Sequence, residues 1–238
     1  MKYIISLSGG KDSTACALWA LNNLNKDDLE FVFLDTKWEH EAVYEYLDYL
    51  EKTLDIKIKR IESEGMLELS KRKKMMPNRV YRFCTENLKI KPFNEYIYKN
   101  YIEKNIDFIV IQGIRREESQ ARADTPVFAE KKETYNRKSF IVKNLYPIVD
   151  WTTKQVFEYL KQNNIEPNEL YKKGFSRVGC YPCIFANKGE LKLLAGDKKY
   201  LKRLRDLEAE VSEVIGKKAK FFAKDVEKHI NTKSLFSV

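Results

Sequence analysis

Apolar positions in the first half of this chain follow two alternating periods. Short apolar runs typical of buried strands are followed by stretches in which apolar residues recur at helical spacing. The predicted strands cover residues 2–8, 30–36, 56–62 and 107–112, and the predicted helices cover 12–25, 39–54 and 94–105. Strands that alternate with helices indicate βαβ units. We therefore predict an α/β fold with a doubly wound parallel sheet.

From Asp150 onward the pattern becomes helical, with a cysteine-bearing loop between the helical stretches. We predict two parts: an α/β domain over residues 1–150, and a smaller, mostly helical C-terminal region over 151–238. Residues 187–238 have the pattern of basic amphipathic helices. Such helices suit a homodimer contact, a lid or a nucleic-acid surface equally well.

Composition places the chain among globular proteins with a substantial core, since 43% of its 238 residues are hydrophobic. It has no apolar run of about 18 residues, and its first apolar stretch is too short for a signal peptide. We expect no membrane span and a cytoplasmic location. The net charge of +9 favours an anionic partner such as a nucleotide, tRNA or DNA. The run "KRKK" (71–74) fits such a partner, and it fits a solvated helix face as well.

The first predicted strand ends in two glycines and a run of polar side chains, "SLSGGKDS" (6–13). Glycines let backbone N–H groups approach a phosphate without a Cβ in the way, and a helix N-terminus adds further donors. Lys11 supplies a charge, and Ser8 and Ser13 supply hydroxyls. An ordinary N-cap would explain Asp12 or Ser13 but not the whole run. We therefore predict a phosphate-binding loop.

Two other predicted strands also end in polar side chains. Asp35 and Thr36 follow the second strand, and the segment "GIRREESQARA" (113–123) follows the fourth. Ligands of doubly wound sheets bind beyond the carboxyl ends of the strands. Arginine guanidinium groups bind phosphate or sulfate oxygens in pairs. The sequence therefore predicts an anion site at this edge of the sheet.

Three of the four cysteines are candidates for chemistry. Cys180 and Cys183 form a C-x-x-C pair and Cys84 lies in a basic stretch, whereas Cys16 lies among Ala and Leu and is expected in the core. Three thiolates could hold a [4Fe-4S] cluster with one open iron, or a Zn²⁺ ion with a fourth ligand such as His40. They could also be redox or sulfur-carrying thiols, or the pair could simply staple a turn. Taken alone, both histidines are expected at the surface.

Several segments resemble a known family. "SGGKDS" matches the S-G-G-x-D-S signature of the PP-loop ATP pyrophosphatases, and "RFCTENLKIKP" is similar to an element found in several of their branches. The segments that resemble the phosphoadenosine phosphosulfate (PAPS) reductase family within that group are 113–123, 146–160 and 167–184. The motifs occur in the expected order between about residues 4 and 190. The resemblance implies a Rossmann-like PP-loop domain.

The resemblance also implies roles for individual residues. In the PP-loop group the loop holds the pyrophosphate of ATP, which is split between its α and β phosphates to adenylate a substrate. For such a reaction in this chain we expect Mg²⁺ to bridge the phosphates. The residues implied to hold phosphate or sulfate are Ser8, Gly9, Gly10, Lys11, Asp12 and Ser13, with Gly113, Arg115, Arg116 and Arg122 completing the anion site. Those implied to lie near the adenosine are Asp35 and Thr36. Our own candidates for catalysis are Lys11, Asp12, Cys84, Cys180 and Cys183.

Two departures from the family pattern keep the reaction open. The reductases attack the sulfonate with a cysteine on a C-terminal tail, whereas no cysteine follows Cys183 in this sequence. Cluster-bearing adenosine 5′-phosphosulfate (APS) reductases use an adjacent Cys-Cys pair, where this chain has Phe83-Cys84. We therefore expect ATP-dependent sulfur transfer from a sulfur donor, with tRNA or DNA as candidate acceptors. The alternatives are PAPS or APS reduction with a thioredoxin-like reductant, and a nucleotide-binding accessory subunit of a modification or defence complex.

Overall fold

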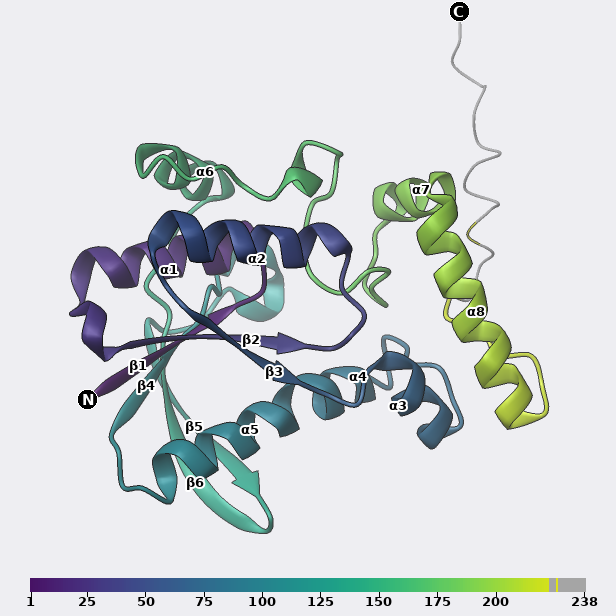
Figure 1. The fold of residues 1–238 in the computed structure, drawn as a ribbon, viewed down its shortest axis with the longest axis horizontal. Helices are drawn as coiled ribbons and strands as arrows, with labels where there is room; N and C mark the ends of the chain where they lie inside the picture. Colours follow the sequence, from purple (N-terminus) through teal and green to yellow (C-terminus); the bar gives the residue numbers. More distant parts are fainter. Residues whose placement is uncertain (223–225, 227–238) are drawn as a thin grey trace, which may run out of the picture.

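The computed structural model describes residues 1–222 and 226. Within these residues a six-stranded sheet has the order β3-β2-β1-β4-β6-β5 (Figure 1). All neighbouring strands pair in parallel except β5 and β6. The strands are β1 (Lys2–Leu7), β2 (Leu29–Asp35), β3 (Ile58–Glu62), β4 (Phe108–Ile111), β5 (Phe128–Tyr135) and β6 (Lys138–Leu145). The predicted α/β fold with helices on both faces is confirmed, with one antiparallel edge strand added.

Helices cover both faces of the sheet. The α-helices are α1 (Lys11–Asn23), α2 (Glu41–Leu54), α3 (Met66–Lys73), α4 (Phe83–Thr85), α5 (Lys91–Ile97), α6 (Thr153–Gln162), α7 (Lys188–Gly196) and α8 (Lys198–Ile215). Figure 1 shows α1, α2 and α6 on one side of the sheet and α5 on the other. Because successive strand residues point to opposite faces, Ile5 and Leu7 pack under α1 and α2, while Ile4 packs toward α5.

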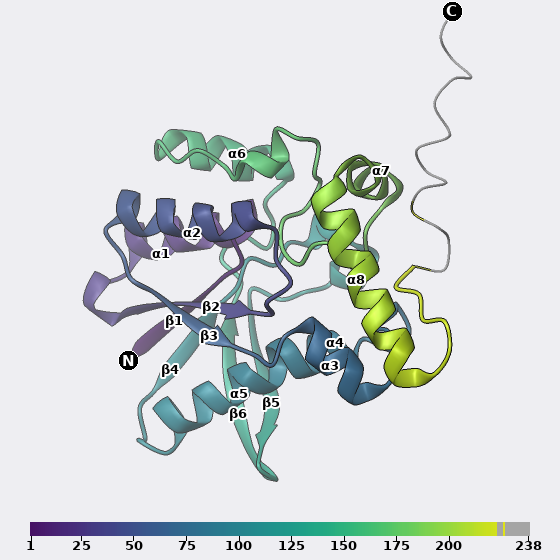
Figure 2. The ribbon, with the colours of Figure 1, turned by 45° about the vertical axis from the view of Figure 1, so that its right-hand side comes forward.

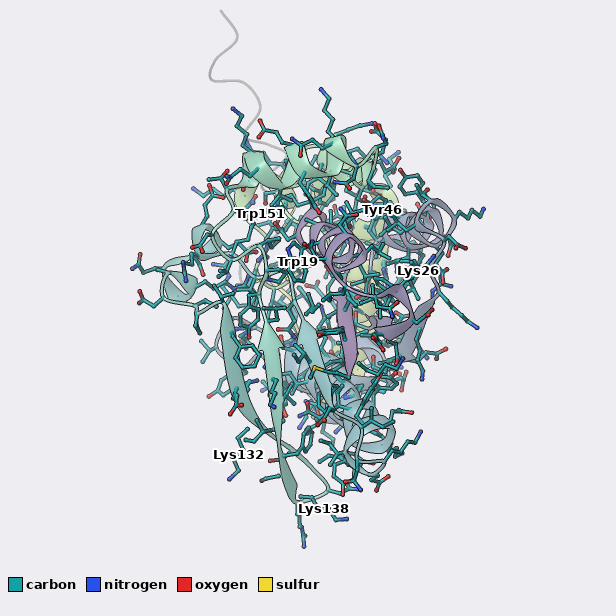
Figure 3. The ribbon with its side chains drawn as sticks, turned by 90° about the vertical axis from the view of Figure 1, so that its left-hand side faces the viewer. Trp19, Lys26, Tyr46, Lys132, Lys138 and Trp151 are labelled. Carbon is teal, nitrogen blue, oxygen red and sulfur yellow. The ribbon has the colours of Figure 1, made fainter. Side chains whose placement is uncertain are left out.

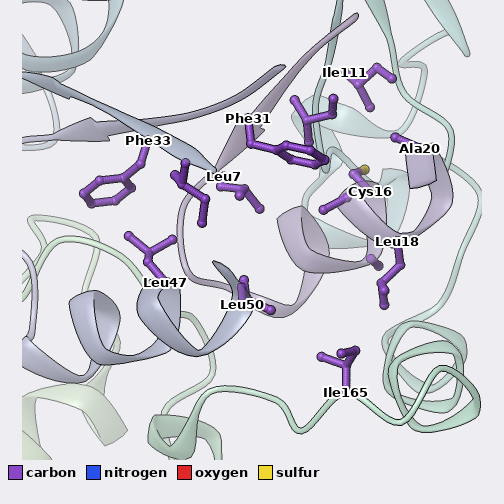
Figure 4. Packing of buried hydrophobic residues seen from close by; sticks show 14 of the residues in the cluster. Leu7, Cys16, Leu18, Ala20, Phe31, Phe33, Leu47, Leu50, Ile111 and Ile165 are labelled. Carbon is purple, nitrogen blue, oxygen red and sulfur yellow. The ribbon is translucent and has the colours of Figure 1, made fainter. Parts of the chain in front are cut away.

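Cys16 lies in the core between the sheet and its covering helices, as predicted. Its side chain is fully buried among the apolar residues shown in Figure 4. Burial also raises the pKa of its thiol. This cysteine therefore packs as a small apolar residue and takes no part in the site at the edge of the sheet.

The helices that follow Asp150 pack on the rest of the protein in two places. Val156 and Leu160 of α6 belong to the same core cluster as α1 and α2. Leu204, Leu207 and Val211 of α8 pack in a separate cluster with α3 (Figure 2). No helix in residues 1–222 and 226 is long and apolar enough to span a bilayer.

The run 71–74 lies at the end of α3, where two of its four cations are in ion pairs. Lys71 Nζ lies 2.5 Å from Glu210 Oε2 of α8, and Arg72 Nη2 lies 2.5 Å from Glu64 Oε1. Arg72, Lys73 and Lys74 are exposed, which is what the alternative of a solvated helix face expects. Nucleic-acid binding by this run stays a prediction.

One predicted helix begins earlier than expected. The sequence predicts a helix from Asn94, after Pro92, whereas helical backbone runs from Phe83 to Ile102 without a break. A wide, π-type turn precedes the proline, and in it the N–H of Lys91 donates to the carbonyl of Glu86. The helix is thus already distorted where the proline ring removes a regular hydrogen bond.

The hairpin of β5 and β6 is not predicted from the sequence. Its two turn residues, Asn136 and Arg137, have φ angles of 45° and 64°. These are the positive values that a two-residue hairpin turn requires, but the usual glycine is missing from the turn. Lys132 and Lys138 project near its tip (Figure 3). The structure places β6, with Phe140 and Val142 facing inward, beside β4.

Candidate functional site

The predicted phosphate loop is the turn between β1 and α1. Glycine is favoured at position 9 for two reasons. Its φ is +73°, in the left-handed region, and a Cβ there would lie only 2.9 Å from Val43 Cγ1. The loop is closed by Ser13, whose Oγ donates to the carbonyl of Gly10 at 2.9 Å and accepts from the N–H of Ser8 at 3.1 Å. No side chain caps α1 at Gly10. A capping side chain therefore does not compete with an anion for the N–H groups at the start of the helix.

Two cations neutralise the acidic residue of this loop. Lys11 Nζ lies 2.6 Å from Asp12 Oδ2, and Arg115 Nε lies 2.6 Å from Asp12 Oδ1. Arg115 also pairs with Glu117 and donates to the carbonyl of Trp151. Its side chain is only 3% exposed. The guanidinium predicted to contact the ligand anion is thus fully engaged inside the protein, where it ties β4 to α1.

Gly113 has a packing role at the same place. A Cβ on this residue would lie 2.6 Å from the backbone carbon of Asp12 and 2.8 Å from the nitrogen of Ser13. Real Cβ atoms do not approach backbone so closely, so any side chain at this position would displace the first turn of α1. The glycine that follows β4 therefore lets the two strand ends meet.

The other two predicted arginines lie in different surroundings. Arg116 forms an ion pair with Asp150 and donates to the carbonyl of Thr125. Arg122 pairs with Glu118 and lines a cavity. Of the three guanidinium groups that the sequence assigns to an anion site, Arg122 is thus the one beside this cavity.

This cavity, of about 350 Å³, lies at the carboxyl edge of the sheet. It brings together residues from distant parts of the sequence, and six predicted site residues line it: Ser8, Thr36, Cys84, Arg122, Cys180 and Cys183. The other predicted site residues do not line it: Gly9, Gly10, Lys11, Asp12, Ser13, Asp35, Gly113, Arg115 and Arg116. Arg82, Lys89 and Arg177 add positive charge to its wall, against one acidic side chain, Glu190. The cavity thus suits an anionic ligand.

Two charged residues that the sequence analysis misses flank Cys180. Glu39 Oε1 lies 3.6 Å from Cys180 Sγ and accepts a hydrogen bond from Thr36 Oγ1 at 2.7 Å. Burial raises the pKa of the Cys180 thiol to about 11, although the ammonium of Lys89 acts in the opposite direction. Burial also raises the pKa of Glu39. Both residues could have been found from their positions in the sequence. Glu39 comes shortly after the end of β2, and Lys89 lies in the "CTENLK" segment five residues after Cys84.

Asp35, at the end of β2, is engaged locally. Its Oδ1 accepts from the hydroxyl of Tyr44 at 2.8 Å and from the N–H of Lys37 at 2.7 Å. Its neighbour Thr36 is the residue that reaches the cavity. The predicted adenosine contacts therefore divide into one residue that lines the cavity and one that shapes the strand end.

The three thiols at the cavity do not form a metal site. In the part of the chain that the structure describes, no three His, Cys, Asp or Glu side chains are grouped to hold an ion. His40, the candidate fourth ligand, is buried rather than at the surface as expected, and its Nδ1 accepts from the N–H of Ala42. It stacks on Tyr200 with ring centroids 4.4 Å apart. His229 lies outside the described residues. This arrangement does not fit a [4Fe-4S] cluster or a Zn²⁺ ion, and we derive no step through either.

Comparison with known families gives a match over most of the chain. The model described as "Phosphoadenosine phosphosulfate reductase domain" matches residues 2–186. An adenosine 5′-phosphosulfate reductase of Salinibacter ruber is 28% identical over 155 residues, which cover 63% of this chain and 56% of that protein.

Two uncharacterized proteins are more similar. Protein MJ0066 of Methanocaldococcus jannaschii is 35% identical over 190 residues, covering 79% of this chain and 37% of that protein. A 37.8 kDa protein of Escherichia phage 186 is 36% identical over 234 residues, covering 79% and 68%. The chain therefore spans less than two thirds of the archaeal and Salinibacter relatives.

Solved structures share the fold at low sequence identity. The PAPS reductase of Candida auris superposes with a TM-score of 0.55 at 17% identity, covering 77% of this chain and 83% of that chain. The FMN adenylyltransferase of Candida glabrata, solved with FAD and inorganic pyrophosphate, gives 0.51 at 17% identity, covering 75% and 55%. At these identities the likeness is one of fold.

Proposed function

The chain belongs to the phosphoadenosine phosphosulfate reductase domain family, and on this premise we propose that it is an enzyme that adenylates an acceptor with ATP and then transfers sulfur to it. Pyrophosphate and AMP are the by-products, and tRNA or DNA is the candidate acceptor. The observation that carries the proposal is the shared cavity. Its wall joins Ser8 of the phosphate loop to the thiols of Cys84, Cys180 and Cys183. A nucleotide and a sulfur nucleophile would thus meet in one place.

The loop supplies donors suited to the phosphates of ATP. Within residues 1–222 and 226, the N–H groups of Gly10, Asp12 and Ser13 have no hydrogen-bond partner. Helix N-terminal N–H groups bind anions readily. Lys11 adds charge once a phosphate competes with Asp12 for its ammonium. Mg²⁺, carried in with ATP, would offset the remaining charge of the β and γ phosphates.

The chemistry then takes two displacements. An oxygen of the acceptor attacks the α phosphorus, the bond to the bridging oxygen of the β phosphate breaks, and pyrophosphate leaves. The outer sulfur of a persulfide on one of the three thiols next attacks the activated carbon, and AMP leaves with the oxygen. A second of the three thiols then attacks the resulting disulfide bond, which frees the acceptor as a thiol and leaves a cysteine disulfide that an external thiol reductant reduces. The basic wall formed by Arg82, Lys89, Arg122 and Arg177 would stabilise the departing anions.

The test measures AMP and pyrophosphate formed from labelled ATP in the presence of Mg²⁺, a persulfide donor, a thiol reductant, and either tRNA or DNA. We expect both products from the wild type. We expect loss of both in Lys11→Met, whereas Cys180→Ser should keep pyrophosphate release and lose AMP release together with sulfur incorporation. If no acceptor or donor yields AMP, the proposal is wrong. Metal analysis of anaerobically purified protein checks separately whether the thiols take up iron or zinc.

A second candidate is reduction of PAPS or APS, which the APS reductase relative and the thiols in the cavity favour. A cysteine thiolate would attack the sulfonate sulfur and expel the nucleotide, and a thioredoxin-like reductant would then release sulfite. Sulfite formation that is lost in Cys180→Ser supports this candidate. Binding of ATP without turnover in either assay would instead favour an accessory subunit that needs a partner protein.

A further inference from the structure

The hydroxyl of Tyr171 lies on the phosphate loop. Tyr171 ends a short helical turn over Glu169–Tyr171, and its oxygen accepts a hydrogen bond from the N–H of Lys11 at 2.9 Å. A Cβ built on Gly10 would lie 3.3 Å from the same oxygen. The phenol therefore covers the loop at close range, although 160 residues separate Tyr171 from Lys11.

Neighbouring contacts hold Tyr171 in this position. Asn168, which is fully buried, donates from Nδ2 to the carbonyls of Gly9 at 3.3 Å and Ala42 at 3.0 Å. The ring of Phe157 meets the Tyr171 ring edge-on, with centroids 5.4 Å apart. The segment that carries Tyr171 is thus hydrogen-bonded to the loop itself, and these contacts hold the phenol next to the N–H of Lys11.

Among the described residues, the backbone N–H of Lys11 is hydrogen-bonded, whereas the N–H groups of the neighbouring loop residues are not. The N–H groups of Gly10, Asp12 and Ser13 have no partner among residues 1–222 and 226, whereas that of Lys11 is taken by Tyr171. The phenol oxygen occupies a place where an oxygen of a bound phosphate would accept. The ammonium of Lys11 also lies over the ring, 5.7 Å from its centroid. One aromatic side chain thus lies close to both the backbone N–H and the ammonium of Lys11.

We infer that the hydroxyl of Tyr171 competes with ligand phosphate for the N–H of Lys11 and so lowers the affinity of the loop for phosphorylated ligands. Phosphate binding exchanges the phenol oxygen for a phosphate oxygen on this donor. The identity of the ligand as ATP rests on the proposed function, but the competition itself concerns any phosphate or pyrophosphate at the loop.

The test uses Tyr171→Phe, which removes the competing oxygen and keeps the ring. The probes are inorganic pyrophosphate, ATP and adenosine, titrated calorimetrically into the whole chain. Because one hydrogen bond is lost from the free state alone, we expect pyrophosphate and ATP to bind about threefold more tightly to the variant. Adenosine, which has no phosphate, should bind equally well to both proteins.

The matched control is Tyr159→Phe. The hydroxyl of Tyr159 accepts from Asn22 Nδ2 at 2.9 Å, so this variant also loses one tyrosine hydrogen bond to α1, but away from the loop. Its affinity for pyrophosphate should equal that of the wild type. Thermal unfolding of all three proteins would show whether each remains folded at the titration temperature.

The other outcomes overturn the inference. Unchanged or weaker pyrophosphate binding by Tyr171→Phe would show that the phenol is neutral or assists the ligand. Failure of pyrophosphate to bind either protein would show that the loop is not an anion site. The proposed function fails separately: tighter pyrophosphate binding without AMP formation would leave the inference standing and remove the ATP reaction.

Discussion

Arg115 Nε lies 2.6 Å from Asp12 Oδ1 and joins the segment after β4 to the first turn of α1 across 103 residues of sequence. Asp12 Oδ2 is held by Lys11 at the same time. A carboxylate inside a phosphate loop would repel the ligand. Because two cations are bound to it, that repulsion would be offset, and backbone N–H groups of the loop would be left to attract the phosphate of the proposed ligand.

Removing Arg115 should destabilise the protein strongly. Arg115→Met takes away one of the two cations that hold Asp12 and the partner of Glu117, and the loss of one partner of a buried ion pair costs about 3 kcal/mol. Urea unfolding measures the change. The control is Arg116→Met, whose pair with Asp150 is exposed and should contribute about 1 kcal/mol or less. Equal losses in the two variants would contradict the structural role of Arg115.

Gly113 should not tolerate a methyl group. In Gly113→Ala the new Cβ would lie 2.6–2.8 Å from the backbone of Asp12 and Ser13, so α1 must shift, at a cost of about 1–3 kcal/mol. We expect weaker pyrophosphate binding as well, since the loop moves with the helix. Gly196→Ala serves as the control because its Cβ would meet nothing within 4 Å. The prediction fails if both variants are as stable as the wild type.

The fold could be predicted from the sequence further than the site. The periods of the first half give β1 to β4 and the helices α1 and α2, because those segments bury one face in a regular pattern. The hairpin of β5 and β6 was not predicted because Asn136 and Arg137 form its turn without a glycine. The polar residues that follow the strands showed at which edge of the sheet the cavity lies. They did not show that Arg122 lines the cavity while Arg115 is held by Asp12. That distinction depends on packing between segments far apart in the sequence.

Glu39 should destabilise the folded protein once it is ionised. Burial raises its pKa above the unfolded value of about 4.3, so the folded state binds the proton more tightly. The stability of the wild type relative to Glu39→Gln should thus be greatest below pH 4 and fall as the pH rises through the folded-state pKa. Urea unfolding at pH 5 and pH 8 measures the difference between the two proteins.

The neighbouring Glu41 provides the control for this pH dependence. Its pKa is lowered, chiefly by a hydrogen bond from Lys199, so its ionised form is favoured in the folded state. Stability that depends on Glu41 should therefore be present above the unfolded pKa and be lost toward acid, the opposite sign. The prediction for Glu39 would be refuted if the free energy of unfolding of Glu39→Gln fell relative to that of the wild type between pH 5 and pH 8.

Cys180 should react slowly with iodoacetamide at neutral pH and faster as the pH approaches about 11, the value to which burial raises its pKa. Lys89→Met should slow the reaction further, since the ammonium of Lys89 lowers that pKa. Mass spectrometry of the peptide that carries Cys180 gives the rate. Cys16, buried in the core, is the unreactive internal reference. Alkylation of Cys180 at the rate of a free thiol at pH 7.5 would be inconsistent with the site as described.

The central claim is that nucleotide phosphates bind at the loop between β1 and α1, and calorimetric titration of ATP into wild type, Lys11→Met and Lys26→Met tests it most directly. Lys26 is an exposed lysine that pairs with Asp55 away from the loop. The account predicts that Lys11→Met weakens ATP binding by about tenfold or more, while Lys26→Met matches the wild type. Equal affinities in all three proteins, or no binding of ATP to any of them, would contradict it.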